Sequence, residues 1–383
     1  MALLFWISLL LLAYVYVGYP AVVWLRAAIA AKPHRAGTLE PAVTLIVVAH
    51  NEEQRIAARL DNILALDYPR DRLEVIVASD GSTDATVALA RRYASRGVVV
   101  RAFRVRRGKA AVLNDVVPVA SGDIIVMADA RQRFDRDAVH ALVGDFADPS
   151  VGAVSGELMI TPKTVGDGVG KGVGFYWRYE KFIRRQESLA GSTVGVTGAI
   201  YAIRRHLFEP IADDTILDDV VIPLHIVKRG YRVLFESSAK AFDEASAQAR
   251  HEFIRKVRTI AGTFQLFARE TWLFDPWRDP VWLEAISHKG LRLATPLLQV
   301  TALAANIAIA GDWPYGWLLA AQALFYLAAI GGIVQRRAER AVFFLTLPYT
   351  ICLLSCATVV GFVQFVTGRQ KATWERVPAS VRS

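Results

Sequence analysis

Cysteine is nearly absent from this 383-residue chain, and the only two, Cys352 and Cys356, lie four residues apart in an apolar stretch. Such a pair excludes a disulfide framework and a four-thiolate zinc site, so we expect two thiols on a lipid-facing or core surface. Charge is missing from residues 1–25 and rare after Leu293, although 21% of all residues are charged and the mean hydropathy is +0.30. The sequence therefore predicts membrane segments at both ends of a polar middle.

Several common functional signatures are absent as well. No glycine-rich dinucleotide or P-loop pattern follows the first predicted strand, and neither an HExxH nor a GxSxG motif occurs. These absences argue against a dinucleotide-binding fold, a P-loop triphosphatase, a zinc peptidase and a serine hydrolase. The net charge of +9 comes without a zinc-finger, basic-zipper or RNA-binding aromatic pattern. We therefore expect no nucleic-acid partner and a basic face toward an anionic bilayer.

The first apolar run ends at Leu25, is long enough to cross a bilayer, and is predicted to be a retained anchor, residues 1–25. A cleavable signal peptide is the alternative, given the small residues 28–30, but it requires positive charge before the apolar run. The positive residues follow the run instead, at Arg26, Lys32 and Arg35. By the positive-inside rule the amino terminus then lies outside and the polar middle in the cytoplasm, as in a multi-pass protein of the inner (cytoplasmic) membrane.

The carboxyl-terminal part is predicted to hold three transmembrane helices within residues 291–366, near 291–311, 313–334 and 341–366. The basic loop QRRAER before the last helix favours a cytoplasmic position. Three spans would leave the basic tail, residues 367–383, outside, whereas the arginines and lysine of that tail favour the inside. Residues 271–290 mix tryptophans with charges and prolines, which predicts a segment in the membrane interface; tryptophans packed in a core are the alternative.

The middle of the chain, residues 40–270, alternates strands with helices. Short β-branched runs without clean alternation predict strands buried on both faces, at 43–49, 73–79, 98–103 and 123–129. Amphipathic stretches separate these runs, so the expected fold class is α/β with an open, mostly parallel sheet. Ligands of such sheets bind beyond the carboxyl ends of the strands. This chain places polar residues there, namely His50, Asn51, Glu52, Asp80, Asp129 and Arg131.

Carboxylates at these strand ends suit the handling of a nucleoside diphosphate. Asp80 can accept hydrogen bonds from a base or a ribose, and Asp129 can bind Mg²⁺ or Mn²⁺ that bridges a diphosphate. The sequence Asp80-Gly81-Ser82 is ambiguous when taken alone, because it suits a turn and a helix cap equally well.

Seven motifs in order carry a more specific indication: TLIVVAHNEE, VIVASDGSTD, GKAAVLN, IIVMADA, VTGAIYAIRR, LDDVVIPLHIVKRGYRV and RKVRTIAGTFQ. Together, from Val43 to Gln265, they resemble the membrane-bound branch of the inverting family-2 glycosyltransferases that includes cellulose and hyaluronan synthases. The resemblance implies a GT-A catalytic domain flanked by transmembrane helices. It also implies transfer of a sugar, with inversion, from a UDP- or GDP-sugar to a lipid-linked or growing polysaccharide acceptor, in exopolysaccharide or cell-envelope glycan synthesis.

The donor-binding residues that the resemblance implies are Asn51, Glu52, Asp80, Lys109 and Asp129. Asp129 matches the first carboxylate of the family's DxD metal motif, whereas an arginine, residue 131, occupies the second position. That arginine would either replace part of the role of the Mg²⁺ or Mn²⁺, or leave the cation held by Asp129 and the phosphates alone. A first-turn helix charge is the alternative for Glu52, and a solvated helix start is the alternative for Lys109.

Asp219 matches the catalytic base of the family's TED-like motif, with a simple helix-start charge as the alternative. Arg258 matches the arginine of the family's QxxRW stretch, where it would neutralise the leaving diphosphate. The same stretch implies diphosphate or acceptor contacts for Arg255 and Gln265. Thr259 replaces the tryptophan that stacks on the acceptor sugar in processive synthases.

Three functions remain open at this point. The missing tryptophan and the small number of spans favour addition of one or a few sugars to a polyprenyl phosphate or a lipid-linked oligosaccharide. A processive polysaccharide synthase is the first alternative. A non-catalytic membrane partner of a polysaccharide assembly complex is the second. The incomplete DxD motif favours that partner, but the retained acids and the arginine of the QxxRW stretch argue against it.

Overall fold

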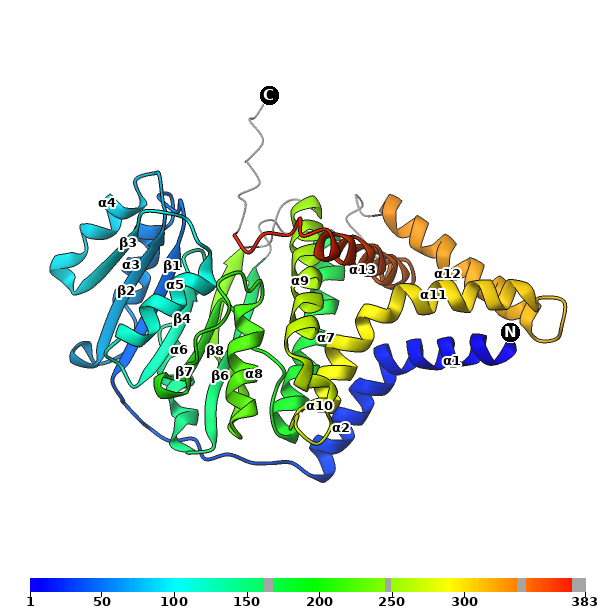
Figure 1. The fold of residues 1–383 in the computed structure, drawn as a ribbon, viewed down its shortest axis with the longest axis horizontal. Coiled ribbons are helices and arrows are strands. Elements are labelled where there is room, and N and C mark those ends of the chain that lie inside the picture. Colours follow the sequence, from blue (N-terminus) through cyan, green and yellow to red (C-terminus); the bar gives the residue numbers. More distant parts are fainter. Residues whose placement is uncertain (162–167, 245–248, 336–341, 374–383) are drawn as a thin grey trace.

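The computed structural model describes residues 1–161, 168–244, 249–335 and 342–373 (Figure 1). A sheet domain, whose strands lie within residues 43–161 and 200–244, forms one end of the molecule, and long apolar helices from both ends of the chain form the other. The polar middle and apolar ends of the sequence therefore correspond to two spatially separate parts.

The sheet domain is built on one mixed sheet, in which eight described strands are ordered β3-β2-β1-β4-β7-β6-β8-β5. Neighbours from β3 to β4 in this order are parallel, β7 runs antiparallel to both β4 and β6, and β8 pairs parallel to β6 and antiparallel to β5. The strands are β1 (Val43–Ala49), β2 (Leu73–Asp80), β3 (Val98–Phe103), β4 (Ile124–Asp129), β5 (Arg133–Phe134), β6 (Val151–Thr161), β7 (Ile200–Arg204) and β8 (Arg232–Glu244).

The parallel half of the sheet confirms the predicted strands, because β1 to β4 each begin and end within one residue of the predicted runs. The register pairs Ala49 of β1 with Ser79 of β2, and Val48 of β1 with Asp129 of β4. The polar residues that follow these strands therefore meet at one edge of the sheet, as expected for parallel strands.

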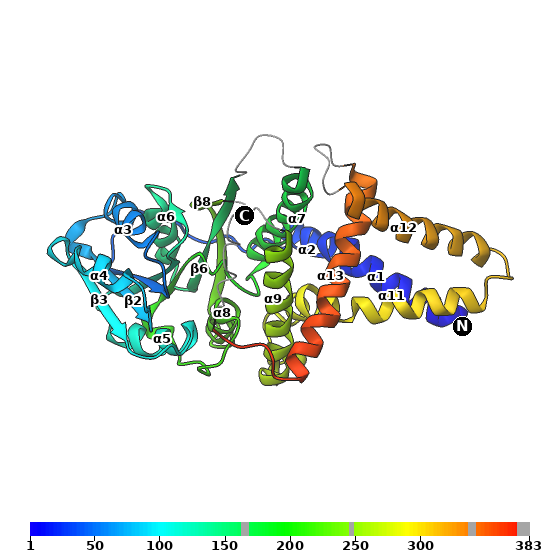
Figure 2. The ribbon, with the colours of Figure 1, turned by 90° about the horizontal axis from the view of Figure 1, so that it is seen from above.

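Helices cover both faces of the sheet, with α3 and α6 on one side and α5 and α8 on the other (Figure 2). Leu45 and Val77 pack with α3 and α6, whereas Ile46 and Ile76 pack with α5 and α8. Because both faces are buried, the strands lack an alternating pattern. The covering helices are α3 (Ile56–Leu64), α4 (Thr86–Arg91), α5 (Lys109–Val116), α6 (Ala138–Gly144) and α8 (Asp218–Lys228).

Four described stretches are long and apolar enough to cross a membrane: Ala2–Ile29, Trp282–Ala308, Tyr315–Gln335 and Phe343–Val366. The first comprises α1 (Ala2–Ala13) and α2 (Tyr19–Ile29), which are joined by a π-helical turn, Tyr14–Gly18. The others contain α11 (Leu291–Ala308), α12 (Tyr315–Gln335) and α13 (Phe343–Val366). The predicted number of apolar helices is thus confirmed, and the two cysteines of α13 are free thiols.

Two long helices, α7 (Gly168–Ala190) and α9 (Ala249–Arg269), lie between the sheet domain and the apolar helices (Figure 1). α13 packs against α9 so closely that a Cβ added to Gly361 would lie 2.9 Å from Ile260. Figure 2 shows α13 running across the direction shared by α11 and α12. Beyond α13, the chain returns to the sheet domain.

The segment predicted to lie in the membrane interface, residues 271–290, is only partly helical. It contains a short turn, Thr271–Phe274, then α10 (Trp282–Glu284) and a π-helical turn, Ala285–Gly290, that continues into α11. Trp277 is 91% exposed, whereas Trp272 packs against the core of the sheet domain. The alternative of core tryptophans therefore holds for Trp272 and not for Trp277.

Candidate active site

The loop after β1 is bound to the loop after β2 through residues of the first predicted donor motif. Asn51 adopts a positive φ of 54°, and its Oδ1 accepts a hydrogen bond from the Thr83 amide at 2.8 Å. The Glu52 amide donates to Thr86 Oγ1 at 2.7 Å, and its carboxylate pairs with Arg55 at 3.0 Å. Asn51 and Glu52 thus lie at the predicted edge of the sheet, in two loops fixed to each other.

Asp80, at the end of β2, holds the loop that leads to α5. The residue is 4% exposed, and its two carboxylate oxygens accept hydrogen bonds from the amides of Arg107 at 2.7 Å and Gly108 at 2.9 Å. The backbone at Gly81 packs directly against the loop before α5, since a Cβ added to Gly81 would lie 2.5 Å from the Arg106 amide nitrogen. Asp80 therefore positions the start of α5, a role that the sequence motif did not reveal.

Lys109, the first residue of α5, lies among the acids of the site. Its Nζ is 3.0 Å from Asp129 Oδ1 and 3.5 Å from Asp218 Oδ2, and it donates to the Gly198 carbonyl at 3.4 Å. Burial acts to lower the pKa of Lys109, but Asp129 and Asp218 outweigh it and hold the pKa well above its ordinary value. The alternative of a solvated lysine is therefore wrong: this ammonium joins β4 to the start of α8.

Asp219 occupies the first turn of α8, and a glycine-containing loop packs against it. The Asp219 carbonyl accepts a hydrogen bond from Val196 at 2.9 Å, and a Cβ added to Gly198 would lie 2.7 Å from Asp219 Oδ2. Burial and the neighbouring Asp218 raise the pKa of Asp219 to about 6, against the opposing effect of three cations, Lys109, Lys289 and Arg184. A carboxylate that ionises near neutral pH is suited to accept a proton in catalysis.

Tyr201 of β7 belongs to the same cluster, although the sequence did not indicate it. The side chain is fully buried, and its hydroxyl has no hydrogen-bond partner among the described residues. Burial and the nearby Asp218 raise the pKa of Tyr201 well above its ordinary value, so the hydroxyl keeps its proton. An unpaired buried hydroxyl costs about 1–3 kcal/mol, so Tyr201 is a strained polar group of the core close to the acids. Its only sequence signal is a polar aromatic residue among the apolar residues that begin β7.

Arg258 of α9 approaches the acids from the side of the long helices. Its guanidinium donates to the carbonyls of Ile216 at 3.4 Å and Ala372 at 2.7 Å. Burial lowers the pKa of Arg258, and the charges of Asp218 and Asp219 oppose that lowering. Arg258 is therefore close enough to Asp218 and Asp219 for their charges to act on it, and it also binds the segment that follows α13.

The other two residues of the predicted diphosphate or acceptor set have local partners. The Gln265 amide accepts from the Ile216 amide at 2.9 Å and donates to the Asp214 carbonyl at 3.0 Å, so it holds the loop before α8. Arg255 forms an ion pair at 2.5 Å with Glu252, one turn earlier on α9. These contacts make Gln265 a positioning residue and leave Arg255 paired within its own helix.

The second position of the DxD motif turns toward β8. Arg131 forms an ion pair with Asp243, which also accepts a hydrogen bond from Gln132 at 3.1 Å. The Asp129 side chain is 42% exposed, and its contact with Lys109 uses Oδ1. Within the described ranges, no three His, Cys, Asp or Glu side chains gather as a metal site. A cation here would depend on Asp129 and on oxygens of a bound donor.

In a comparison with known proteins, residues 44–211 match the family model described as glycosyl transferase family 2. The chain therefore contains a family 2 glycosyltransferase domain. This confirms the resemblance drawn from the seven motifs. The match ends just before the segment that carries Asp219. It assigns no role to individual side chains, so the roles of all the site residues named from the motifs stay predictions.

Curated relatives that match this domain include a polysaccharide synthase and a glycolipid synthase. A poly-beta-1,6-N-acetyl-D-glucosamine synthase of Staphylococcus aureus is 27% identical over 233 residues, 60% of this chain and 56% of that protein. A beta-monoglucosyldiacylglycerol synthase of Synechocystis is 27% identical over 245 residues, 62% of this chain and 50% of that protein. The chain thus spans about half the length of the curated relatives it matches.

A solved structure matches nearly the whole chain. It is a mannosyltransferase from Pyrobaculum calidifontis in complex with GDP-Man and Mn²⁺, with a TM-score of 0.73 and 28% identity over 96% of this chain and 99% of that one. The α/β prediction of a GT-A domain flanked by apolar helices is therefore confirmed.

Proposed function

We propose that the chain is a membrane glycosyltransferase that transfers a sugar, with inversion, from a nucleoside diphosphate sugar to a hydroxyl of a lipid-linked or growing glycan. The observation that carries this proposal is the juxtaposition of Asp219, a carboxylate with a raised pKa, with Lys109, Asp129 and Arg258 at the edge of a family 2 domain. A base beside a group of cations is what displacement of a diphosphate requires.

In the proposed reaction, each of these groups has a separate role. Asp219 takes the proton of the acceptor hydroxyl as its oxygen bonds to the anomeric carbon. The bond from that carbon to the diphosphate oxygen breaks on the opposite face, and the diphosphate leaves with the electron pair. The charged Lys109 and Arg258 side chains are placed to stabilise the negative charge that develops there.

The divalent cation predicted from the family fits a site with one protein carboxylate. Asp129 is partly exposed and its contact with Lys109 leaves Oδ2 available, so it suits a hard cation such as Mg²⁺ or Mn²⁺. A cation bound there would supply Lewis-acid stabilisation of the diphosphate. The similar mannosyltransferase was solved with Mn²⁺, which supports this part of the proposal.

The acceptor is proposed to receive one or a few sugars. Thr259 is exposed and its hydroxyl donates back to the Arg255 carbonyl at 3.0 Å, so this position of α9 offers no aromatic surface for an acceptor sugar. A processive synthase remains the second candidate, because one curated relative is a polysaccharide synthase. Long polymer made by the purified protein from donor alone would favour that second candidate.

We further propose that the protein is a multi-pass inner-membrane protein with a cytoplasmic sheet domain. The contact of Ala372 with Arg258 supports a tail on the same side of the membrane as that domain. The crosswise orientation of α13 supports an interfacial helix that does not cross the bilayer. Two crossings, α11 and α12, would then follow the domain, and the basic tail would lie inside, as its charge requires.

A panel of nucleotide sugars incubated with the purified full-length protein tests the proposed activity. We expect donor hydrolysis or transfer with one nucleotide class, and loss of at least roughly 10²-fold in Asp219→Asn. Asp71→Asn, a change at an exposed acid outside the site, is the matched control and should leave the rate unchanged. Binding of a nucleoside diphosphate without any turnover would instead favour the non-catalytic partner.

A further inference from the structure

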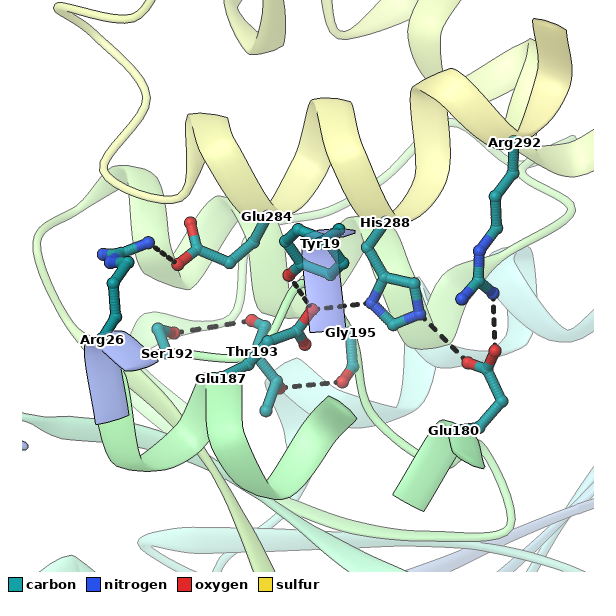
Figure 3. Close-up of polar contacts among 10 residues, drawn as sticks. All are labelled: Tyr19, Arg26, Glu180, Glu187, Ser192, Thr193, Gly195, Glu284, His288 and Arg292. Atoms are coloured by element: carbon teal, nitrogen blue, oxygen red, sulfur yellow. Dashed lines mark hydrogen bonds and ion pairs between the residues drawn. The ribbon is translucent and has the colours of Figure 1, made fainter. Parts of the chain in front are cut away.

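A buried ionic network joins α7 to α2 and to the π-helical turn before α11 (Figure 3). The Tyr19 hydroxyl of α2 donates to Glu187 at 2.5 Å, and His288 Nδ1 lies 2.7 Å from the same carboxylate. The other ring nitrogen of His288 is 3.0 Å from Glu180, which also accepts a hydrogen bond from Arg292 at 2.5 Å. Both acids of α7 are buried. Their contacts hold this face of α7 in place.

Arg184 lies on the same face of α7 and supports the loop that leads from α7 to β7. Residues 180, 184 and 187 are spaced by four and three positions, which places their side chains on one side of a helix. Arg184 Nη1 donates to Thr197 Oγ1 at 2.9 Å. Ser155 of β6 contacts the same residue, because its Oγ accepts from the Thr197 amide at 2.9 Å and lies 3.2 Å from Thr197 Oγ1. Thr197 is therefore held by α7 and by β6.

The next residue of this loop, Gly198, packs directly against the predicted base. A Cβ added to Gly198 would lie 2.7 Å from Asp219 Oδ2 and 3.2 Å from Asp219 Cγ. The Val196 amide donates to the Asp219 carbonyl at 2.9 Å, so the loop contacts both the side chain and the backbone of the base. The Gly198 carbonyl also accepts from Lys109 Nζ at 3.4 Å. One short loop thus contacts the base and the lysine on the expected donor side.

The placement of this loop limits where the Asp219 carboxylate can lie. A general base acts only within hydrogen-bond reach of the proton that it takes, and a misplacement of about 1 Å can slow a reaction roughly 10²-fold. Because the Gly198 backbone lies against the carboxylate, a shift of the loop changes the rotations open to Asp219. Burial raises the pKa of Asp219, and the charge of Arg184 is among those that oppose this rise. Arg184 thus affects both the position and the charge of the base.

We propose that Arg184 is a positioning residue for the base Asp219. Through its hydrogen bond to Thr197, it holds Gly198 against the carboxylate and so sets the direction in which that carboxylate faces. This inference rests on the proposed transferase function, and it adds a residue that contacts no reacting atom. The attachment of α7 to α2 and to the turn before α11 gives Arg184 a fixed place. The base is therefore held in a defined position relative to the apolar helices.

Hydrolysis of GDP-mannose, UDP-glucose and UDP-N-acetylglucosamine by the full-length protein in a nonionic detergent tests this proposal, with water as the acceptor. Thr197→Val keeps the shape and every charge but removes the hydroxyl that accepts from Arg184, so kcat should fall roughly tenfold or more. Thr197→Ser keeps that hydroxyl, and its kcat should stay within roughly threefold of the original. In both variants the affinity for GDP and UDP, measured by calorimetry, should stay within about twofold.

The pH profile of kcat separates the position of the base from its charge. Arg184→Gln should lower kcat and move the midpoint of the profile to higher pH, because it removes a cation that opposes the raised pKa of Asp219. Arg184→Lys keeps the charge, so it should keep the original midpoint and restore part of kcat. Thr197→Val should lower kcat without moving the midpoint. Arg185→Gln, a change at an exposed cation of the same helix, is the control and should change neither.

Two results would overturn the positioning role. The first is an equal kcat in Arg184→Gln and Arg185→Gln, or in Thr197→Val and Thr197→Ser. The second is a loss of GDP or UDP affinity that matches the loss of kcat, since Arg184 would then bind the donor directly. If the unmutated protein releases no nucleoside diphosphate from any of the three donors, the proposed function itself is wrong.

Discussion

Replacing Asp219 with asparagine should stabilise the folded protein at neutral pH while removing most of its transfer activity. Burial and Asp218 raise the pKa of Asp219 from 3.8 to about 6, so the folded protein disfavours the ionised carboxylate. The rise corresponds to roughly 3 kcal/mol between the charged and neutral forms. A group used as a base in this way reduces stability at the pH where it works.

The sign of the effect follows from linkage. Because the folded pKa lies above the unfolded one, the stability linked to Asp219 is complete below about pH 4 and is lost as the pH rises through about 6. Asparagine carries no charge at any pH. At pH 7.5 the Asp219→Asn protein should therefore be more stable by up to about 3 kcal/mol, and at low pH the two proteins should be alike.

Tryptophan fluorescence during thermal unfolding, at roughly pH 5 and 7.5, measures this difference. We expect a higher Tm for Asp219→Asn at the upper pH, a smaller gap at the lower pH, and no gap for Asp71→Asn. In the unmutated protein, transfer should fall roughly tenfold from pH 7 to 5, because only about a tenth of the base is ionised there. A lower Tm for Asp219→Asn at neutral pH, or a flat pH profile of transfer, would refute the assignment.

Three other changes test separate parts of the site. A chelator should abolish transfer and Asp129→Asn should reproduce its effect; full turnover in excess chelator would show that the chain's own cations suffice. Arg258→Ala should slow transfer roughly 10²–10³-fold with nucleotide affinity retained, and unchanged kcat would contradict its role at the leaving group. Asp80→Ala should weaken nucleoside diphosphate binding in calorimetry and lower Tm, because it leaves two backbone amides without their acceptor. Equal affinity in that variant would exclude Asp80 from donor binding.

The parallel half of the fold was predictable because buried strands and their polar ends are local features. Asp80 and Asp129 end apolar runs directly, so the sequence indicates both the strand and the edge where it ends. The other half depends on pairing between distant strands. β6 and β8 pair in parallel although many residues separate them, and β7 inserts between β4 and β6. No short-range pattern specifies such an order.

The cations that oppose the raised pKa of Asp219 were not predictable for a related reason. Lys289 lies between His288 and Arg292 at the start of an apolar run, and Arg184 is one of several charges on a long helix. Neither residue stands out in the sequence. Their effect on Asp219 follows from the fold, in which α7, the turn before α11 and the loop before β7 meet. Tyr201 is similar, because its neighbours Asp218 and Lys109 come from two other helices.

For α13, hydropathy alone does not distinguish a helix that crosses the membrane from one that lies at its surface. Residues Phe343–Val366 are as apolar as the other candidate spans, so composition alone predicts a crossing. α13 packs against α9 and runs across α11 and α12, and we propose that it lies at the membrane surface, where a helix meets the same compositional test. The number of crossings after the sheet domain would then change from three to two, and the tail would change sides. The 2.7 Å hydrogen bond from Arg258 to the Ala372 carbonyl supports a tail on the same side of the membrane as α9, which the charge of the tail independently favours.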